Sequence, residues 1–255
     1  MKKYVGMVSS DWSQCLSPNG PFDAFIFHYP DIRSDLERIF RRYTANEISL
    51  SRAVNQLKAA VPAPLTIEQM DDYLSAHFEI YKGVDGLIRW CHEHRIVFMI
   101  NTTGFMAYFQ RIFSAGLLPP ITALSAQSMH RFNQSARSPQ EMIELTEIED
   151  KAANSAAVAK RFNISPEKIV LIGDSGGDGP HFQWGAKIGA TLVGSMAKPS
   201  LRHYCRENGV RIHHHFGHTY AKGEKVSIDK ERNFDFQNLS TVIGSAVGVK
   251  GLGKK

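Results

Sequence analysis

Two carboxylates four positions apart follow an apolar run in the segment IVLIGDSGGDGP, residues 169–180. Asp174 and Asp178 of this turn could together hold one hard divalent cation through oxygen ligands, and Mg²⁺ is the usual choice beside phosphate. The glycines of the turn allow tight bending and close approach of the backbone to a ligand. Such a turn is also common as plain structure, so alone it is weak evidence for a metal site.

A third carboxylate, Asp11, ends the first apolar run of the chain, within VSSDWSQCL at residues 8–16. If both runs are strands of one parallel sheet, their carboxyl ends lie at one edge, and the three aspartates could meet there. Thr102 and Thr103 follow another apolar run and offer hydroxyls at the same edge, although they could equally be a helix N-cap. Lys151 could bring a cation there, or could be an ordinary surface lysine.

The runs that must position these residues are short, continuous and apolar, as strands covered on both faces are. We expect strands at 4–8, 96–101, 168–173 and 190–196. Helical patterns connect them as in βαβ units. These patterns are VDGLIRWCHEH, MAYFQRIFSAG, KAANSAAVAKRF and HFQWGAKIG. The predicted fold class is therefore α/β, a doubly wound parallel sheet.

Residues 17–83 interrupt this rhythm with amphipathic patterns and no strand between them. The three helical patterns there are SDLERIFRRYT, SLSRAVNQLKAAV and TIEQMDDYLSAHFEIY. We predict an all-helical cap domain inserted into a core domain formed by residues 1–16 and 84–255. The cap could cover the carboxyl ends of the strands, where ligands bind in such sheets, or could pack away from them.

The composition is that of a soluble globular protein, with 43% hydrophobic and 22% charged residues. The net charge of +5 is small, and basic residues concentrate only in the tail 250–255, which is weak evidence for nucleic acid or an anionic membrane. Three cysteines without a CxxC pair suggest no disulfide framework and fit a reducing cytoplasm. No stretch approaches the ~20 apolar residues needed to cross a bilayer. We therefore expect a cytoplasmic protein without a nucleic-acid or membrane partner.

Four histidines lie close together in the segment RIHHHFGHTY, residues 211–220. Consecutive side chains point to opposite sides of a strand, which separates possible metal ligands rather than bringing them together. We predict an exposed strand or hairpin at this segment, in preference to a metal cluster.

Taken together, the motifs resemble those of the haloacid dehalogenase (HAD) superfamily of phosphatases and related hydrolases. That family carries an Asp within D-x-D-x-[TV] after its first strand, a Thr or Ser after the second, a Lys, and an acidic G-D-x-x-x-D loop. The matching stretches occur here in the same order, namely DWSQCL, INTTGF, Lys151 and GDSGGD. INTTGF and the spacing from Lys151 to Asp174 are similar to those of phosphoserine phosphatases. The resemblance covers about residues 1–200 and implies a Rossmann-like core.

The resemblance implies covalent chemistry, in which Asp11 attacks phosphorus and water then hydrolyses the aspartyl-phosphate. It also implies Mg²⁺, held by Asp11, the backbone carbonyl of Ser13, and Asp174 or Asp178. The residues implied to bind the phosphoryl group are Thr102, Thr103, Gly104 and Lys151. The expected partner is a small phosphorylated metabolite.

One departure from the family pattern concerns acid–base catalysis. Phosphatases of this family normally have a second Asp two residues after the nucleophile, and here that position is Ser13. A hydroxyl with a pKa far above 7 is a poor general acid or base. Three hypotheses stay open: a phosphatase, a C–P hydrolase whose leaving group needs no proton, and a phosphate- and metal-binding module without turnover. A shifted register would instead make Ser9 the nucleophile, but it loses the match at Leu16.

The substrate is not fixed by the sequence. The arginine that grips the substrate carboxylate in phosphoserine phosphatases would fall near Asn55 or Leu57, so phosphoserine is not the expected substrate. Arg41, Arg42 and Arg52 could bind an anionic substrate from the cap, or could simply be solvated.

Overall fold

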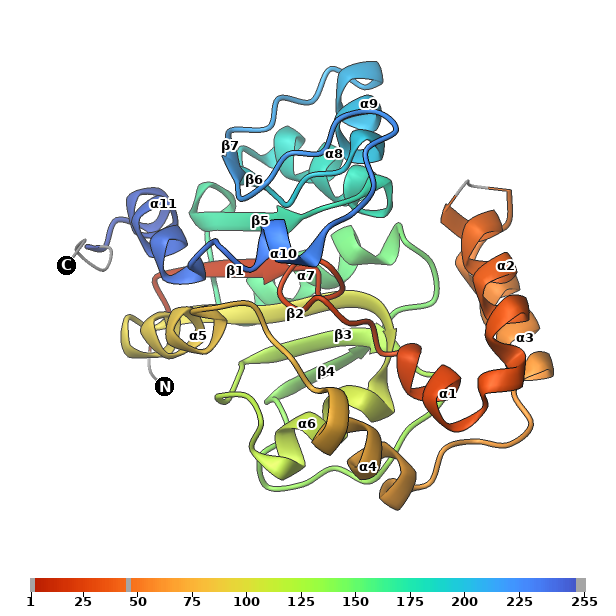
Figure 1. Ribbon diagram of the computed structural model, residues 1–255. Helices are drawn as coiled ribbons and strands as arrows, with labels where there is room; N and C mark the ends of the chain where they lie inside the picture. The colour runs from red at the N-terminus through yellow and green to blue at the C-terminus, as the bar shows by residue number, and fades with distance from the viewer. Residues whose placement is uncertain (1–2, 45–46, 251–255) are drawn as a thin grey trace.

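The computed structural model describes residues 3–44 and 47–250, so residues 251–255 of the basic tail lie outside the described ranges. Seven strands form one parallel sheet in the order β4-β3-β2-β1-β5-β6-β7 (Figure 1). The strands are β1 (Gly6–Ser10), β2 (Ile96–Phe105), β3 (Ala123–Gln127), β4 (Glu141–Glu144), β5 (Ile169–Gly173), β6 (Thr191–Ser195) and β7 (His214–Phe216). The predicted α/β class with a parallel sheet is confirmed.

Helices cover both faces of the sheet. Neighbouring residues of a central strand point to opposite faces, so each packs against a different set of helices. In β1, Met7 packs into one hydrophobic cluster and Val8 into another. The cluster around Met7 includes side chains of α7 (Asp150–Arg161), α8 (Gly179–Ile188) and α9 (Pro199–Glu207). The cluster around Val8 includes side chains of α5 (Val84–Glu93), α6 (Met106–Ala115) and α11 (Leu239–Val247). Burial on both faces explains why these strands are continuously apolar.

The order of the strands places a reversal beside β1. The chain runs outward from β1 through β2 and β3 to β4, and then returns to β5 on the other side of β1. The carboxyl ends of β1 and β5 therefore border the point at which the direction of winding reverses. In open α/β sheets this point is where ligands bind.

Four of the strands match the sequence prediction, with shifted ends. β1 extends to Ser10 rather than Val8, since the Ser9 hydroxyl lies 2.9 Å from the Ser155 hydroxyl and the Ser10 hydroxyl donates to the Asp11 carbonyl at 2.9 Å. β2 continues to Phe105, beyond a register irregularity in its pairing with β3.

Three strands were not located individually by the sequence prediction. β3 has the sequence ALSAQ, in which Leu124 is the single large apolar residue, and β4 is a partly exposed edge strand of sequence EMIE. Neither has an apolar run that could identify it. β7 is the opposite edge strand and falls in the histidine-rich segment, where an exposed strand was one of the predicted forms.

The segment between β1 and α5 is helical, as predicted. Its helices are α1 (Asp23–His28), α2 (Arg33–Thr44), α3 (Leu50–Ala60) and α4 (Ile67–His77). α4 lies on α6, where Arg111 makes two 2.8 Å hydrogen bonds with Asp71. α2 and α3 pack against each other beyond the carboxyl ends of the strands, on the right in Figure 1. The inserted helices contribute to the same hydrophobic cluster as the sheet, including Ile39 of α2 and Leu74 of α4.

The chain after β7 returns across the molecule to the end of the insertion. Buried Glu231 of α10 (Ile228–Glu231) accepts hydrogen bonds from the hydroxyls of Tyr81 and Tyr220. Two histidines near β7 contact other protein groups: His213 Nδ1 accepts the Leu192 N–H, and His218 Nε2 lies 2.7 Å from a Glu224 carboxylate oxygen. Short 3₁₀ turns are found at Pro30–Ile32, Pro166–Lys168, Gly176–Asp178 and Phe236–Asn238. None of the helices in the described ranges is long and apolar enough to span a membrane.

A buried polar network joins β1, β2, α7 and α8. The Ser155 hydroxyl lies 2.9 Å from both the Ser9 hydroxyl and His181 Nε2, and it accepts a hydrogen bond from the Asn101 amide at 3.0 Å. The same amide donates to the backbone carbonyl of Lys151 at 2.8 Å. Burial, together with the nearby Lys151 ammonium, lowers the pKa of His181 to about 3. The native fold therefore holds this imidazole neutral.

The neutral imidazole makes stability depend on pH. As the pH falls from 7 to 5, His181 becomes protonated in the unfolded chain, whose pKa is about 6.5, but stays neutral in the folded one. The free energy of unfolding should then drop by about 2 kcal/mol from this group alone. Other groups also titrate over this range, so the measure is the change in unfolding free energy between pH 7 and pH 5, from urea unfolding, compared among variants. That change should be about 2 kcal/mol more unfavourable in the wild type and in the exposed-site control His203→Gln than in His181→Gln. The same change in His181→Gln as in the wild type would contradict the assignment.

Candidate active site

Asp11 is placed by the end of β1 and by a tight turn after it. Its backbone N–H donates to the Ile172 carbonyl at 3.0 Å, which continues the β1–β5 pairing beyond the last residue of β1. The Trp12 carbonyl then accepts the N–H groups of Cys15, Leu16 and Ser17. The Trp12 ring is fully buried and packs edge-on against Phe109. With the neighbouring Trp12 anchored in the core, the Asp11 side chain reaches the carboxyl edge of the sheet, where it is 12% exposed.

The acidic loop after β5 is folded around Asp178. One oxygen of the Asp178 carboxylate accepts the N–H groups of Asp174 (3.0 Å) and Ser175 (3.2 Å). This carboxylate lies so close to the end of β5 that a Cβ at Gly173 would be 2.6 Å from Asp178 Cγ. Gly173 therefore has a steric role, because a larger residue would push the carboxylate out of place.

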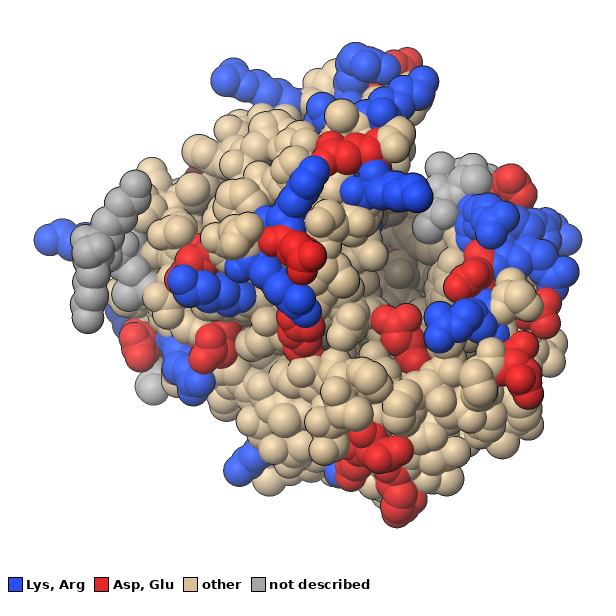
Figure 2. Space-filling view, in the orientation of Figure 1, with Lys and Arg blue, Asp and Glu red and all other residues tan. Residues whose placement is uncertain are grey.

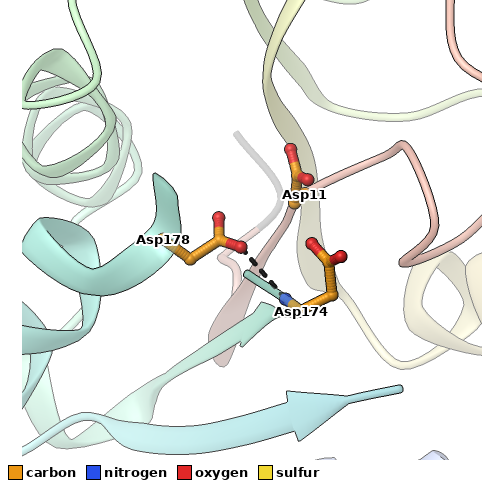
Figure 3. A group of neighbouring side chains, drawn as sticks. All are labelled: Asp11, Asp174 and Asp178. Carbon is orange, nitrogen blue, oxygen red and sulfur yellow. Dashed lines mark hydrogen bonds between the residues drawn. The ribbon is translucent and has the colours of Figure 1, made fainter. Parts of the chain in front are cut away.

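Carboxylate oxygens of Asp11, Asp174 and Asp178 lie within 4.8 Å of one another (Figure 3). The Lys151 ammonium lies between two of these residues, 3.0 Å from Asp11 Oδ1 and 2.7 Å from Asp178 Oδ1. The third carboxylate, that of Asp174, has its own cation, because the Lys198 ammonium lies 2.6 Å from Asp174 Oδ2. The structure thus brings together the three aspartates and the lysine that the sequence predicts to meet.

Burial and the two lysines set the protonation of this cluster. Burial raises the pKa of Asp11 and outweighs the opposing effect of Lys151, and burial raises that of Asp174 to about 7 despite Lys198. Burial acts in the same direction on Asp178, but Lys151 and the two backbone N–H groups bring its pKa below the usual value. Burial acts against the charged form of Lys151, yet the pKa of its ammonium is raised because Asp11 and Asp178 surround it.

The donor set fits a hard divalent cation. It consists of carboxylate oxygens from three residues, and Mg²⁺ prefers oxygen ligands. Asp11 and Asp174 line the adjacent cavity, where a cation could also contact a bound anion. Two ammonium groups already neutralise part of this negative charge, so a cation would have to share the carboxylates with them.

A cavity of about 520 Å³ opens beside the cluster, between the edge of the sheet and α2, and Figure 2 shows the surface hollowed there. From the core, Lys151, Lys198 and the glycines of the acidic loop line it. The inserted helices contribute Phe22, Phe40 and Tyr43. The cavity therefore combines a charged floor with an aromatic wall, which suits an anionic group carried on a less polar body.

The two predicted threonines occupy different environments. Thr103 and Gly104 line the cavity, as does Tyr43 of α2. Thr102 is only 1% exposed, and its hydroxyl accepts the Gly104 N–H at 3.1 Å. Neither threonine caps a helix, because the N-cap of α6 is Phe105. Among the described residues, Thr103 is the threonine that a ligand in the cavity would meet.

The alternative nucleophile and the cap arginines lie apart from this cavity. Ser9 is fully buried within β1 and faces Ser155, so the shifted register has no structural basis. Ser13 does line the cavity, at the position that carries the second Asp in the family pattern. The described lining includes none of Arg41, Arg42 and Arg52, and Arg42 lies 3.4 Å from Glu47.

Sequence reasoning missed Lys198 and Asp23. Lys198 follows β6 and therefore lies at the same edge as Asp11 and Asp174, which the position of the predicted strand at 190–196 could have indicated. Asp23 opens α1 and lines the cavity, and its carboxylate accepts the Gly20 N–H at 2.8 Å. No motif marks Asp23, because it lies in a short helix that had no predicted counterpart.

Solved structures with the same fold include phosphoserine phosphatases and a HAD family hydrolase. A phosphoserine phosphatase carrying a phospho-aspartyl intermediate analogue aligns with 93% of this chain and 98% of its own, with a TM-score of 0.61 and 15% identity. A substrate-bound phosphoserine phosphatase aligns over 80% and 91% of the two chains, with a TM-score of 0.59 and 16% identity. A HAD family hydrolase from Salmonella enterica subsp. enterica serovar Typhi aligns over 84% and 68%, with a TM-score of 0.59 and 16% identity. The fold is that of the HAD superfamily.

Neither the protein-family models nor the curated proteins give a match to the sequence. The motifs suggested a HAD-like fold similar to that of phosphoserine phosphatases. The structural alignments confirm this fold, because they cover nearly all of both chains although the sequence identity is low. In this HAD-like fold, the cluster of three aspartates and Lys151 lies at the carboxyl edge of the sheet, beside the cavity.

The crowding at Gly173 gives a test of how the cluster is assembled. Gly173→Ala should displace the Asp178 carboxylate and lower the free energy of unfolding by about 1–3 kcal/mol, the usual cost of overpacking. It should also abolish calorimetric binding of Mg²⁺. Gly177→Ala is the matched control in the same loop, because its Cβ would lie 3.7 Å from the nearest atom, Ser175 Oγ. Equal stability and Mg²⁺ binding of the two variants would refute this account.

Proposed function

We propose that this protein is a Mg²⁺-dependent phosphomonoesterase of the HAD type that acts on a small phosphorylated metabolite. The observation that supports this most is the position of the Asp11 carboxylate, which lines the cavity and lies 3.0 Å from the Lys151 ammonium. A carboxylate held beside a cation and facing a cavity is suited to attack an electrophilic phosphorus. The HAD-like fold supports the same chemistry.

In this proposal each charged group has a distinct role. Asp11 attacks phosphorus and is released from the aspartyl-phosphate by water, so one difficult displacement becomes two easier ones. Lys151 stabilises negative charge on the phosphoryl oxygens while it keeps Asp11 in place. Thr103 and Gly104 bind the phosphoryl group from the end of β2, and Thr102 fixes the backbone of Gly104 through its hydroxyl.

Mg²⁺ would be held by Asp11, Asp174 and the backbone carbonyl of Ser13, with Asp178 next to them. When bound, the cation would neutralise charge that develops on the phosphoryl oxygens. Asp178 already uses its oxygens for Lys151 and two backbone N–H groups, so we assign it mainly to holding the loop.

The cavity also bears on the substrate. Its aromatic wall suits a substrate with an apolar part beside the phosphate, and its described lining has no arginine to grip a carboxylate. We therefore propose a phosphomonoester other than phosphoserine. That the protein is cytoplasmic, without nucleic-acid or membrane partners, stays a prediction from its composition.

Asp11 and the cation are tested together. Phosphate release from a panel of sugar phosphates, nucleotides and aryl phosphates should be lost in EDTA and restored by Mg²⁺. Asp11→Asn should lower kcat by at least ~10³-fold, because a nucleophile is removed. Asp85→Asn, an exposed aspartate paired with Arg89, is the control and should leave kcat within about twofold. Unchanged activity of Asp11→Asn would eliminate the covalent mechanism.

The serine at position 13 leads to a separate prediction about how the hydrolysis rate depends on the leaving group. Without a general acid, the wild type should hydrolyse aryl phosphates with good leaving groups far faster than alkyl phosphates. Ser13→Asp should raise the rate on alkyl phosphates by roughly 10²–10⁴-fold and flatten this dependence on the leaving group. Ser13→Ala should leave the wild-type rates unchanged. A slower Ser13→Asp enzyme would mean that another group already supplies the proton.

The same position keeps two rivals open. Ser13 suits a C–P hydrolase, whose leaving group needs no proton, so phosphonates belong in the substrate panel. A protein that binds phosphate only in the presence of Mg²⁺, but releases none from any member of the panel, would be a binding module instead.

A further inference from the structure

Lys198 occupies a place that the proposed cation would also need. Its ammonium lies 2.6 Å from Asp174 Oδ2, and the Asp174 side chain is only 1% exposed. Asp174 is also one of the three aspartates with oxygens within 4.8 Å of one another. A cation that binds this carboxylate must therefore either share it with Lys198 or replace Lys198.

Lys151 and Lys198 differ in their freedom to move away. The Lys151 side chain is 3% exposed and contacts Asp11 and Asp178 together, so its withdrawal would leave two carboxylates without their counter-ion. The Lys198 side chain is 23% exposed, lines the cavity and pairs with Asp174 alone. Lys198 is thus the ammonium that can exchange.

We propose that Lys198 is a tethered counter-ion of Asp174 that competes with the divalent cation, and that the cation displaces its ammonium into the cavity. The inference rests on the cation site of the proposed function. Lys198 is a positioning residue in this account, because it acts through Asp174.

The backbone around Lys198 allows its side chain to exchange while the loop stays in place. The Lys198 N–H donates to the Asp174 carbonyl at 2.7 Å, and Ser200 Oγ accepts the Gly176 N–H at 3.1 Å. These two hydrogen bonds join the start of α9 to the acidic loop without using the ammonium. Rotation of the side chain then suffices to move the charge from Asp174 toward the rest of the cavity.

The net charge of the aspartate cluster explains why an exchange between the Lys198 ammonium and a divalent cation would be favourable. With all three aspartates ionised, the two ammonium groups leave the cluster with a single net negative charge, so Asp174 is not left buried and unpaired before a cation binds. After a divalent cation binds, the net charge becomes positive. The displaced ammonium then adds to the positive charge that faces an anionic substrate in the same cavity.

Calorimetric titration with Mg²⁺ alone, at one fixed pH and without substrate, tests the competition. Lys198→Met removes the ammonium and should bind Mg²⁺ at least about tenfold more tightly than the wild type, since a nearby positive charge no longer opposes the ion. Lys198→Arg keeps the positive charge and should bind Mg²⁺ about as weakly as the wild type. Lys222→Met removes an exposed lysine beside α9 and should match the wild type as well. Thermal unfolding of each variant, followed by circular dichroism, establishes that it is folded.

The outcomes separate this inference from the proposed function. Equal or weaker Mg²⁺ binding by folded Lys198→Met, with Mg²⁺-dependent phosphate release by the wild type, would overturn the competition and leave the phosphatase intact. Failure of both the wild type and Lys198→Met to bind Mg²⁺ would overturn the cation site itself, and the competition with it. Tighter binding by Lys198→Met, not reproduced by Lys198→Arg or Lys222→Met, is the result expected from competition.

Discussion

The position of the Lys151 ammonium between Asp11 and Asp178 is the interaction on which the rest of the site depends. Lys151 and Asp178 are almost completely buried and Asp11 is 12% exposed, so each would be costly to leave charged and unpaired. One cation between two carboxylates satisfies all of them only if β1, the acidic loop and α7 meet at one point. The parallel sheet provides this meeting point, because β1 and β5 are neighbours whose carboxyl ends lie together.

Structure beneath the cluster fixes α7 relative to the sheet. The Asn101 amide of β2 holds both the Lys151 carbonyl and the Ser155 hydroxyl, and Ser155 in turn contacts Ser9 of β1 and His181 of α8. These four polar residues, which lie within strands and helices, thus fix the start of α7, from which the Lys151 side chain extends. The polar residues that interrupt the apolar runs are therefore part of the support for the site.

Features of the fold and of the site could be predicted from the sequence where a short stretch of residues is enough to identify them. Asp11 and Asp174 were found because each follows a strongly apolar run, and the geometry of a parallel sheet carries the ends of such runs to one edge. Lys151 was found because it opens a helical pattern and because its spacing to Asp174 is similar to that of phosphoserine phosphatases. β3 and β4 lack such runs, since their sequences ALSAQ and EMIE are small, polar or exposed. Which of Thr102 and Thr103 faces the cavity depends on an irregularity late in β2, and no pattern in a single sequence reveals that.

Ser13 and Lys198 both make the site less negative. Ser13 lacks the carboxylate that the D-x-D pattern has at this position, and the Lys198 ammonium lies beside Asp174. The proposed phosphomonoester carries up to two negative charges, so a less negative site would oppose its approach less. Serine at position 13 also lacks the carboxylate that would protonate the leaving oxygen. Within the proposed function, Ser13 therefore favours binding of the anion over assistance to its departing group, which suits a substrate whose leaving group departs without a proton.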